Sequence, residues 1–204
     1  MKIGPKYKIA KRLGASVFEK TMSPKFALAQ ERSARTKKGR GRGATEFGKQ
    51  LLEKQKVRMT YNISERQFSN YVAEAMESKD ASPVEMLHRL LELRLDNVIY
   101  RLGLAPTRRA ARQMVSHGHI TVNGVKTTIP SRRMRVGDRI AVREGSKGAT
   151  IFVGFAEKFM ERSALPAWLS WNPQSMDGGV QEIPGAGVND PAGDLVAVMS
   201  FYSR

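Results

Sequence analysis

Cysteine is absent from the 204-residue sequence, and acidic residues are scarce. The absence of cysteine excludes disulfides, thiolate zinc sites and cysteine nucleophiles. No apolar run approaches the roughly 18–20 residues of a membrane span, and the first residues are charged where a signal peptide needs its apolar core. We therefore expect neither a membrane partner nor export. In their place stand 35 Lys and Arg against 19 Asp and Glu, a net charge of +16 that predicts a polyanionic partner.

The positive charge lies early in the chain. Residues 1–43 carry 13 basic and two acidic side chains, residues 44–143 carry 18 and ten, and residues 144–204 carry four and seven. Residues 1–44 are interpreted as an extended basic arm with a weak apolar pattern, and its Gly-rich end includes Arg40 and Arg42. Such arms typically order on binding nucleic acid, although a disordered, solubilising tail is the alternative.

Hydrophobic periodicity and capping signals predict three helices after the arm. The first spans residues 45–59, the second begins after Ser64 at a capping box, and the third spans residues 82–102. Arg94, Asn97 and Arg101 share one face of the third helix. The run at residues 195–202 alternates like a strand, and residues 150–163 suit a helix, with a strand at residues 151–153 as the alternative.

A compact unit is predicted between Leu93 and about Arg143. Its fourth helix begins after Thr107 and ends at Gly118, and the alternating residues around Asn123-Gly124 indicate a two-residue hairpin. The exposed-looking row on that helix is Arg108, Arg112 and Ser116, beside Arg109 and Gln113. A solvated basic face without a ligand is the alternative interpretation.

Catalytic chemistry has no obvious place in this sequence. His117 and His119 lack a third ligand candidate nearby, so we expect no metal site. No phosphate-loop pattern occurs, and carboxylate pairs such as Glu74 with Glu77 lie on predicted solvated faces. We expect no enzyme and no cofactor. Trp168 and Trp171 are interpreted as packing anchors rather than base-stacking platforms.

Several motifs in one order resemble a known family. They are Leu51–Arg58, Arg94–Gly103, Thr107–Ile120, Val122–Gly124, Pro166–Leu169 and Phe201–Arg204. Together they resemble small ribosomal subunit protein four of the bacterial type, over nearly the whole chain. The resemblance implies an α+β fold with a small RNA-binding module of the alpha-L type inserted into a helical domain.

The domain boundaries that follow from this resemblance are given in chain order. They are a basic arm (1–44), a helical domain (45–92) completed by the C-terminal segment (164–204), the RNA-binding module (93–145) and a connecting helix (146–163).

The resemblance also implies a function and partners. Members bind a multi-helix junction of small-subunit ribosomal RNA early in assembly, and they contact ribosomal protein five at an interface that influences decoding accuracy. Some members repress their own messenger RNA. The expected location is the ribosome, cytoplasmic or organellar.

Arginine suits such a partner, because its planar guanidinium bridges phosphate oxygens whereas lysine offers a point charge. A-form RNA is recognised mainly through phosphates, 2′-hydroxyls and shape. The residues expected to clamp the backbone or add hydrogen bonds in the module are Arg94, Asn97, Arg101, Arg108, Arg109, Arg112, Gln113, Ser116, His117, Asn123 and Lys126. Those expected to hold a second RNA helix are Lys49, Lys54, Lys56, Arg58 and Arg66.

Three positions depart from the family pattern. The arm lacks the cysteine cluster that binds zinc in many relatives, residues 36–43 replace a Pro-Gly-Gln-His-Gly loop, and Ser200 stands where relatives have glutamate. Two other functions are alternatives. An RNA-modifying enzyme would need a catalytic domain larger than the residues after Arg143, and a helix-turn-helix DNA binder would prefer duplex DNA to junction RNA.

Overall fold

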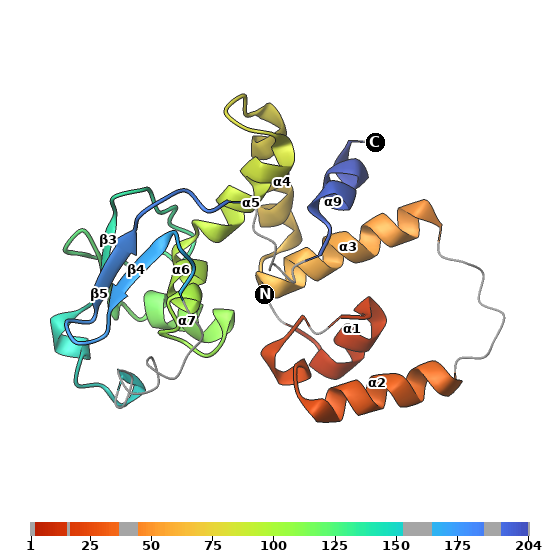
Figure 1. The fold of residues 1–204 in the computed structure, drawn as a ribbon, viewed down its shortest axis with the longest axis horizontal. Coiled ribbons are helices and arrows are strands. Elements are labelled where there is room, and N and C mark those ends of the chain that lie inside the picture. Colours follow the sequence, from red (N-terminus) through yellow and green to blue (C-terminus); the bar gives the residue numbers. More distant parts are fainter. Residues whose placement is uncertain (1–2, 16, 37–44, 153–164, 186–192, 204) are drawn as a thin grey trace. The chain divides into compact units, whose positions relative to one another are not determined.

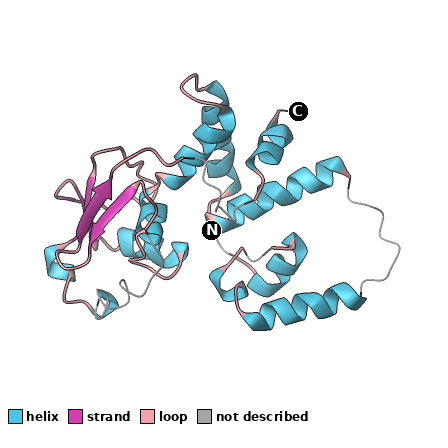
Figure 2. Cartoon of the chain, viewed as in Figure 1, coloured by secondary structure: helices cyan, strands magenta, loops and turns pink. Residues whose placement is uncertain are grey.

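The structure, a computed structural model, describes residues 3–15, 17–36, 45–152, 165–185 and 193–203. The chain divides into two compact units, of which one comprises Met1–Leu87 with Gly187–Arg204 and the other His88–Ala186. The second unit is therefore inserted into the first. Helices build the first unit, whereas the second combines helices with an antiparallel sheet (Figure 1 and Figure 2). The fold class is α+β, as predicted.

The first unit begins with helices where the sequence predicted an extended arm. Its elements are α1 (Lys6–Leu13), the 3₁₀ turn η1 (Glu19–Thr21), α2 (Pro24–Thr36), α3 (Glu46–Thr60), α4 (Glu65–Glu77) and α9 (Leu195–Tyr202). Leu13, Phe18 and Phe26 form a small buried core, against which Leu52 and Met59 of α3 pack. The prediction of an extended arm is therefore wrong for the described residues of this segment. Its apolar side chains lie on separate short elements, so no single helical period connects them. Arg40 and Arg42 lie outside the described residues.

Helices α3 and α4 begin where the capping signals predicted. The Thr45 Oγ1 accepts a hydrogen bond from the Gly48 N–H at 3.2 Å, and the Ser64 Oγ accepts one from the Gln67 N–H at 3.3 Å. On α4, Phe68 is fully buried, in agreement with its apolar stripe. Both helix predictions are confirmed.

The last described element corrects the prediction of a strand. Residues 195–202 form helix α9, which packs along α3 (Figure 1). The Asp194 Oδ1 accepts hydrogen bonds from the N–H groups of Val196 and Ala197 at 2.8 and 3.2 Å, so it caps the helix. A short apolar run fits a strand or a buried helix equally well, and here the cap decides.

The second unit contains two helices and a sheet. Its elements are α6 (Leu95–Arg101), α7 (Arg108–Ser116), β1 (Ile120–Val122), β2 (Val125–Lys126), β3 (Arg139–Val142), the 3₁₀ turns η2 (Glu144–Ser146) and η3 (Thr150–Phe152), β4 (Leu169–Asn172) and β5 (Asp177–Val180). The strands pair antiparallel in the order β2-β1-β3-β5-β4. Asn123 and Gly124 both have positive φ, 52° and 79°, which confirms the hairpin turn between β1 and β2.

A single core joins α6 and α7 to the sheet. Val98 and Ile99 of α6, Val115 of α7, and Ile120 and Ile140 of the strands are all fully buried in it. The glycines of β5 allow its neighbours to approach closely, since a Cβ at Gly178 would collide with the carbonyl oxygen of Ser170. Within the described ranges, no helix is long and apolar enough to cross a membrane.

The predicted third helix is two helices. Helix α5 (Pro83–Glu92) contains the boundary between the units, and the chain turns extended at Arg94, with φ −68° and ψ 135°, before α6 begins. There the Leu95 N–H donates to the Arg132 carbonyl at 2.9 Å and the Asp96 N–H donates to the Pro130 carbonyl at 3.0 Å. The apolar spacing in the sequence continues through Arg94. It cannot reveal the break, because the backbone groups that interrupt the helix belong to residues 130 and 132, far along the chain.

Residues 165–185 also differ from the prediction. They were expected to complete the helical domain, yet β5 pairs with β3 and β4 with β5, so this segment extends the sheet of the second unit. Leu169 and Trp171 are buried in that core. Of the predicted connecting helix, residues 146–152 lie in 3₁₀ turns and loop, and residues 153–163 fall outside the described residues.

Candidate nucleic-acid interface

Helix α7 holds the densest group of predicted RNA-binding residues, and a side chain fixes its first turn. The Thr107 Oγ1 accepts a hydrogen bond from the Ala110 N–H at 3.0 Å. The apolar face of the helix packs into the core of the second unit, whereas Arg109 and Gln113 are exposed. The helix therefore presents a polar, basic surface backed by a rigid core.

A buried carboxylate, Asp96, lies between two guanidiniums. Its oxygens accept hydrogen bonds from Arg94, from Nε at 3.0 Å and from Nη2 at 2.8 Å. The Oδ2 atom also accepts from Arg112 of α7, from Nε at 2.9 Å and from Nη2 at 2.7 Å. Asp96 is 3% exposed and Arg94 is 2% exposed. This pair of bridges connects the start of α6 to the middle of α7.

A second buried carboxylate, Glu92, acts on α7 through an amide. Its two oxygens accept hydrogen bonds from Arg101 Nε and Nη2, each at 2.8 Å. The Asn97 Nδ2 donates to Glu92 at 3.0 Å, and the Asn97 Oδ1 accepts from Arg108 Nε at 2.7 Å. The Arg108 guanidinium also lies 4.4 Å from the Tyr100 ring centroid. Such charge-assisted pairs are stable inside a protein only when geometry and hydrogen bonding are good, as here.

Four of the predicted RNA-binding arginines are thus engaged within the protein. Arg94 and Arg108 are buried, whereas the side chains of Arg101 and Arg112 keep 23% and 25% exposure. Helical periodicity predicts which residues share a face. It does not predict how far ion pairs with acidic residues bury their side chains. RNA contact by these four arginines stays a prediction.

Other cations of this unit reach the surface. Arg109, His117 and Lys126 are exposed, as are Arg133, Arg135 and Arg143, which the motif analysis did not single out. Three arginines within residues 132–135 are a signal that charge clustering alone could have found. These exposed residues are the part of the unit best placed to meet an anionic ligand.

Two polar side chains that were expected to contact RNA, those of Asn123 and Ser116, make hydrogen bonds within the protein. The Asn123 Nδ2 donates to Asp138 Oδ1 at 2.8 Å, and its Oδ1 accepts from the Arg139 N–H at 2.8 Å. The Ser116 Oγ donates to the Arg112 carbonyl at 2.9 Å. Both side chains stabilise local backbone.

The two histidines after α7 lie close together, with ring centroids 6.1 Å apart. The His119 Nδ1 lies 3.1 Å from the Ser146 Oγ. Burial, and then the charges of His117 and Arg143, lower the pKa of His119. Across the described part of the chain, no group of three His, Asp or Glu side chains could hold a metal ion.

In the first unit, the predicted cations of α3 pair with carboxylates. The pairs are Lys49 with Glu46 (3.5 Å), Lys56 with Glu53 (2.5 Å), and Lys54 and Arg58 with Glu65 (2.6 and 3.3 Å). Arg66 is exposed on the first turn of α4. Lys49 is the predicted α3 cation that remains most exposed, so it and Arg66 are the accessible members of this set.

Lys54 belongs to what we call the C-terminal clasp, formed by Lys54, Glu65, Phe201 and Tyr202. The Lys54 Nζ lies 4.5 Å from the Phe201 ring centroid, and the Tyr202 hydroxyl donates to Glu65 Oε1 at 3.0 Å. Burial raises the pKa of Glu65, but the hydrogen bond and charge of Lys54 outweigh it, so the net pKa is lowered. Burial and the Glu65 carboxylate raise the pKa of Tyr202. The clasp ties α9 to α3 and α4.

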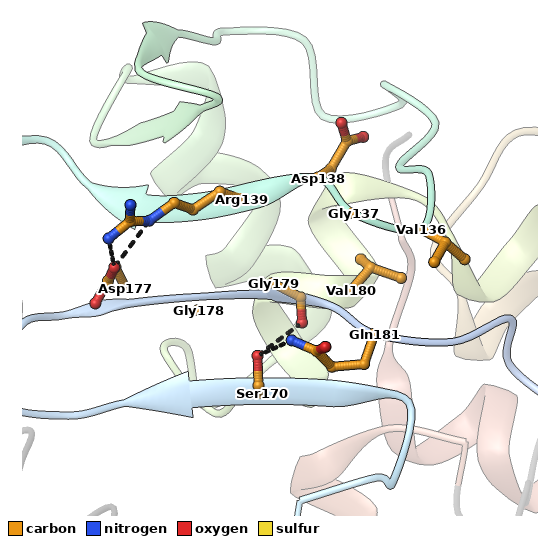
Figure 3. A pocket seen from close by; sticks show the side chains of 10 residues that line it. All are labelled: Val136, Gly137, Asp138, Arg139, Ser170, Asp177, Gly178, Gly179, Val180 and Gln181. Atoms are coloured by element: carbon orange, nitrogen blue, oxygen red, sulfur yellow. Dashed lines mark hydrogen bonds and ion pairs between the residues drawn. The ribbon is translucent and has the colours of Figure 1, made fainter.

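A hollow of about 450 Å³ lies over β3, β4 and β5. Figure 3 shows Arg139 directed toward Asp177 and Gln181 directed toward Ser170, whereas Asp138 points away from them. Arg139 pairs with Asp177, and the Gln181 Nε2 donates to Ser170 Oγ at 2.7 Å. The hydrogen bond from Ser175, and then that from Arg139, lowers the pKa of Asp177. Four of the polar side chains that line the hollow are thus paired with one another.

The fold is a helical unit with an inserted helix-and-sheet module that carries a basic surface. Residues 93–140 match the S4 domain family, and residues 1–92 match the family described as ribosomal protein S4/S9 N-terminal domain. Curated relatives named small ribosomal subunit protein uS4 are similar over nearly the whole chain. That of Roseiflexus castenholzii is 41% identical over 203 residues, 99% of this chain and 98% of the relative, and that of Burkholderia mallei is 39% identical over 209 residues, again 99% and 98%.

The relative from Christiangramia forsetii is 42% identical over 183 residues, 89% of this chain and 88% of the relative. The chain belongs to the family of small ribosomal subunit protein uS4. It is accordingly a structural constituent of the ribosome that binds ribosomal RNA.

Proposed function

We propose that this protein binds a multi-helix junction of small-subunit ribosomal RNA directly and early in assembly, and so organises the body of the subunit. The observation that carries this proposal is the set of exposed cations on α7 and on residues 132–135, mounted on a scaffold of buried arginine–carboxylate pairs. A junction is recognised through phosphates and shape, for which rigidly held cations are suited. The same face is proposed for messenger RNA.

The accessible residues of α7 test this proposal. Arg109→Ala should weaken binding to junction RNA and reduce the slope of log K against log salt by about one unit, because one phosphate contact is lost. Lys79→Ala, which removes an exposed cation in the other unit, is the matched control and should leave the slope unchanged. Equal slopes for Arg109→Ala and the unmodified protein would contradict the proposed face.

We propose a second, protein partner, ribosomal protein five, with which this chain would contribute to translational accuracy. Its support is an exposed apolar surface next to the C-terminal clasp. Phe47 is 49% exposed, its ring centroid lies 5.3 Å from that of Phe201 in a tilted arrangement, and Val196 of α9 is 60% exposed. Large exposed apolar side chains on α3 and α9 are side chains on which a protein partner can pack. Ser200, on the same helix, offers no charge for an ion pair there.

A further inference from the structure

Asp96 is one of only two acidic residues between Arg94 and Arg143, against 11 basic ones. A carboxylate close to an RNA-binding surface opposes the approach of phosphates, because like charges repel. Yet Asp96 is 3% exposed and accepts four hydrogen bonds from two arginines. Its contacts point to a role other than contact with RNA.

On one side, Asp96 fixes the guanidinium of Arg112. The two hydrogen bonds that it donates to Asp96 come from the Nε and Nη2 edge of the group, and the side chain keeps 25% exposure. A guanidinium held along one edge has lost most of its rotamer freedom before any ligand arrives. Binding to its exposed part then costs less ordering entropy than binding to a mobile side chain.

On the other side, Asp96 holds Arg94, where the chain enters α6. The backbone there pairs with the loop that carries Arg133 and Arg135. Arg94 forms an isolated bridge with Arg133, and the Met134 N–H donates to the Leu93 carbonyl at 2.8 Å. One carboxylate therefore connects α7 to the basic loop at residues 130–135.

We infer that Asp96 is a positioning residue for RNA recognition: it holds Arg112 in a fixed orientation and sets the basic loop relative to α7. This inference rests on the proposed RNA face of α7. It assigns the acidic residue no contact with RNA, and it explains why a negative charge lies inside a basic module.

Asp96→Asn is the direct test, because it keeps the size of the side chain and removes the charge that holds both guanidiniums. Glu144→Gln is the matched control, since it removes one negative charge from the same unit at a side chain that is 86% exposed and pairs with Lys147. Dissociation constants for junction RNA are measured at several salt concentrations, with the melting temperature of each variant.

We expect Asp96→Asn to weaken binding about tenfold, on the scale of one well-placed arginine contact, whereas Glu144→Gln binds as tightly as the unmodified protein or more tightly. Arg112→Lys keeps the charge but loses the planar guanidinium that bridges two oxygens, and should weaken binding by a similar factor. In the double variant the two losses should add only in part, because one of the two routes by which Asp96 acts passes through Arg112. Full additivity, or equal affinities for Asp96→Asn and Glu144→Gln, would overturn the inference.

The fold of the variants is controlled separately. If Asp96→Asn does not melt cooperatively, Arg112→Lys carries the test alone, and unmodified affinity of a folded Arg112→Lys protein overturns the inference. Failure of the proposed face is distinguishable, because it appears as an unchanged salt slope for Arg109→Ala. A reduced slope for Arg109→Ala together with unchanged affinity for Asp96→Asn rejects the positioning role alone.

Discussion

A guanidinium that donates two hydrogen bonds to a buried carboxylate is held in one orientation. Arg94, Arg101 and Arg112 are all held in this way, by Asp96 or Glu92. Lysine behaves differently in the C-terminal clasp, where the Lys54 ammonium pairs with Glu65 and lies against the aromatic ring of Phe201. In both places the acidic residue determines where a cation points, and so which cations remain for a partner.

The Glu65 carboxylate gives the clasp a pH dependence. Its folded-state pKa is lowered, so its contribution to stability is present above the usual value of 4.5 and is lost as pH falls through the lowered value. We expect Glu65→Gln to lower the melting temperature at neutral pH, and the difference from the unmodified protein to shrink as the pH falls below 4.5 and through the lowered pKa of Glu65. The effect should be small, since the Glu65 side chain is 47% exposed.

Calorimetry from about pH 7 to about pH 3 measures this difference. Glu77→Gln, at an exposed position of the same helix, is the control. A difference for Glu65→Gln that stays constant over the whole range would argue against the ionised clasp.

At the scale of elements, local signals predicted local structure. The caps at Thr45, Ser64 and Thr107 and the Asn123-Gly124 turn are confirmed, because each depends on residues a few positions apart. The break at Arg94 depends instead on a backbone partner near residue 132. The depth of the α7 arginines likewise depends on Glu92 and Asp96, whose approach only the folded chain reveals.

Helix α9 offers an element-scale test of the protein partner. Val196→Asp places a charge on its exposed apolar face, and should weaken binding to purified ribosomal protein five by roughly tenfold, about 1.4 kcal/mol. The melting temperature should stay nearly unchanged, because Val196 is 60% exposed. Ser203→Ala, at an exposed residue after the helix, is the control. Unchanged affinity for the Val196 variant would remove this surface from the proposed interface.

At the scale of the whole molecule, the N-terminal helices contribute to the core of the first unit as well as to its charge. Deleting residues 1–43 removes α1 and α2 and exposes Leu52 and Met59. We expect the melting temperature to fall by several degrees, since roughly 2–4 °C corresponds to each kcal/mol lost in a chain of this size. RNA affinity should fall as well, because 13 basic residues leave with the segment.

Two single substitutions separate packing from charge in that deletion. Phe26→Ala removes a ring that is 1% exposed and should reproduce the loss of melting temperature. Lys25→Ala removes an exposed charge and should not. A deletion variant that melts like the intact protein would show that these helices do not stabilise the rest.

The discontinuous first unit has a consequence for how the chain is made. Helix α9 belongs with α3, yet it follows the whole inserted unit in the chain and is synthesised after it. The inserted unit ends at Ala186 and has its own core. All of its residues have therefore been synthesised before α9, which packs on α3, exists. In the nascent protein, the chain of the inserted unit is therefore complete before that of the first unit.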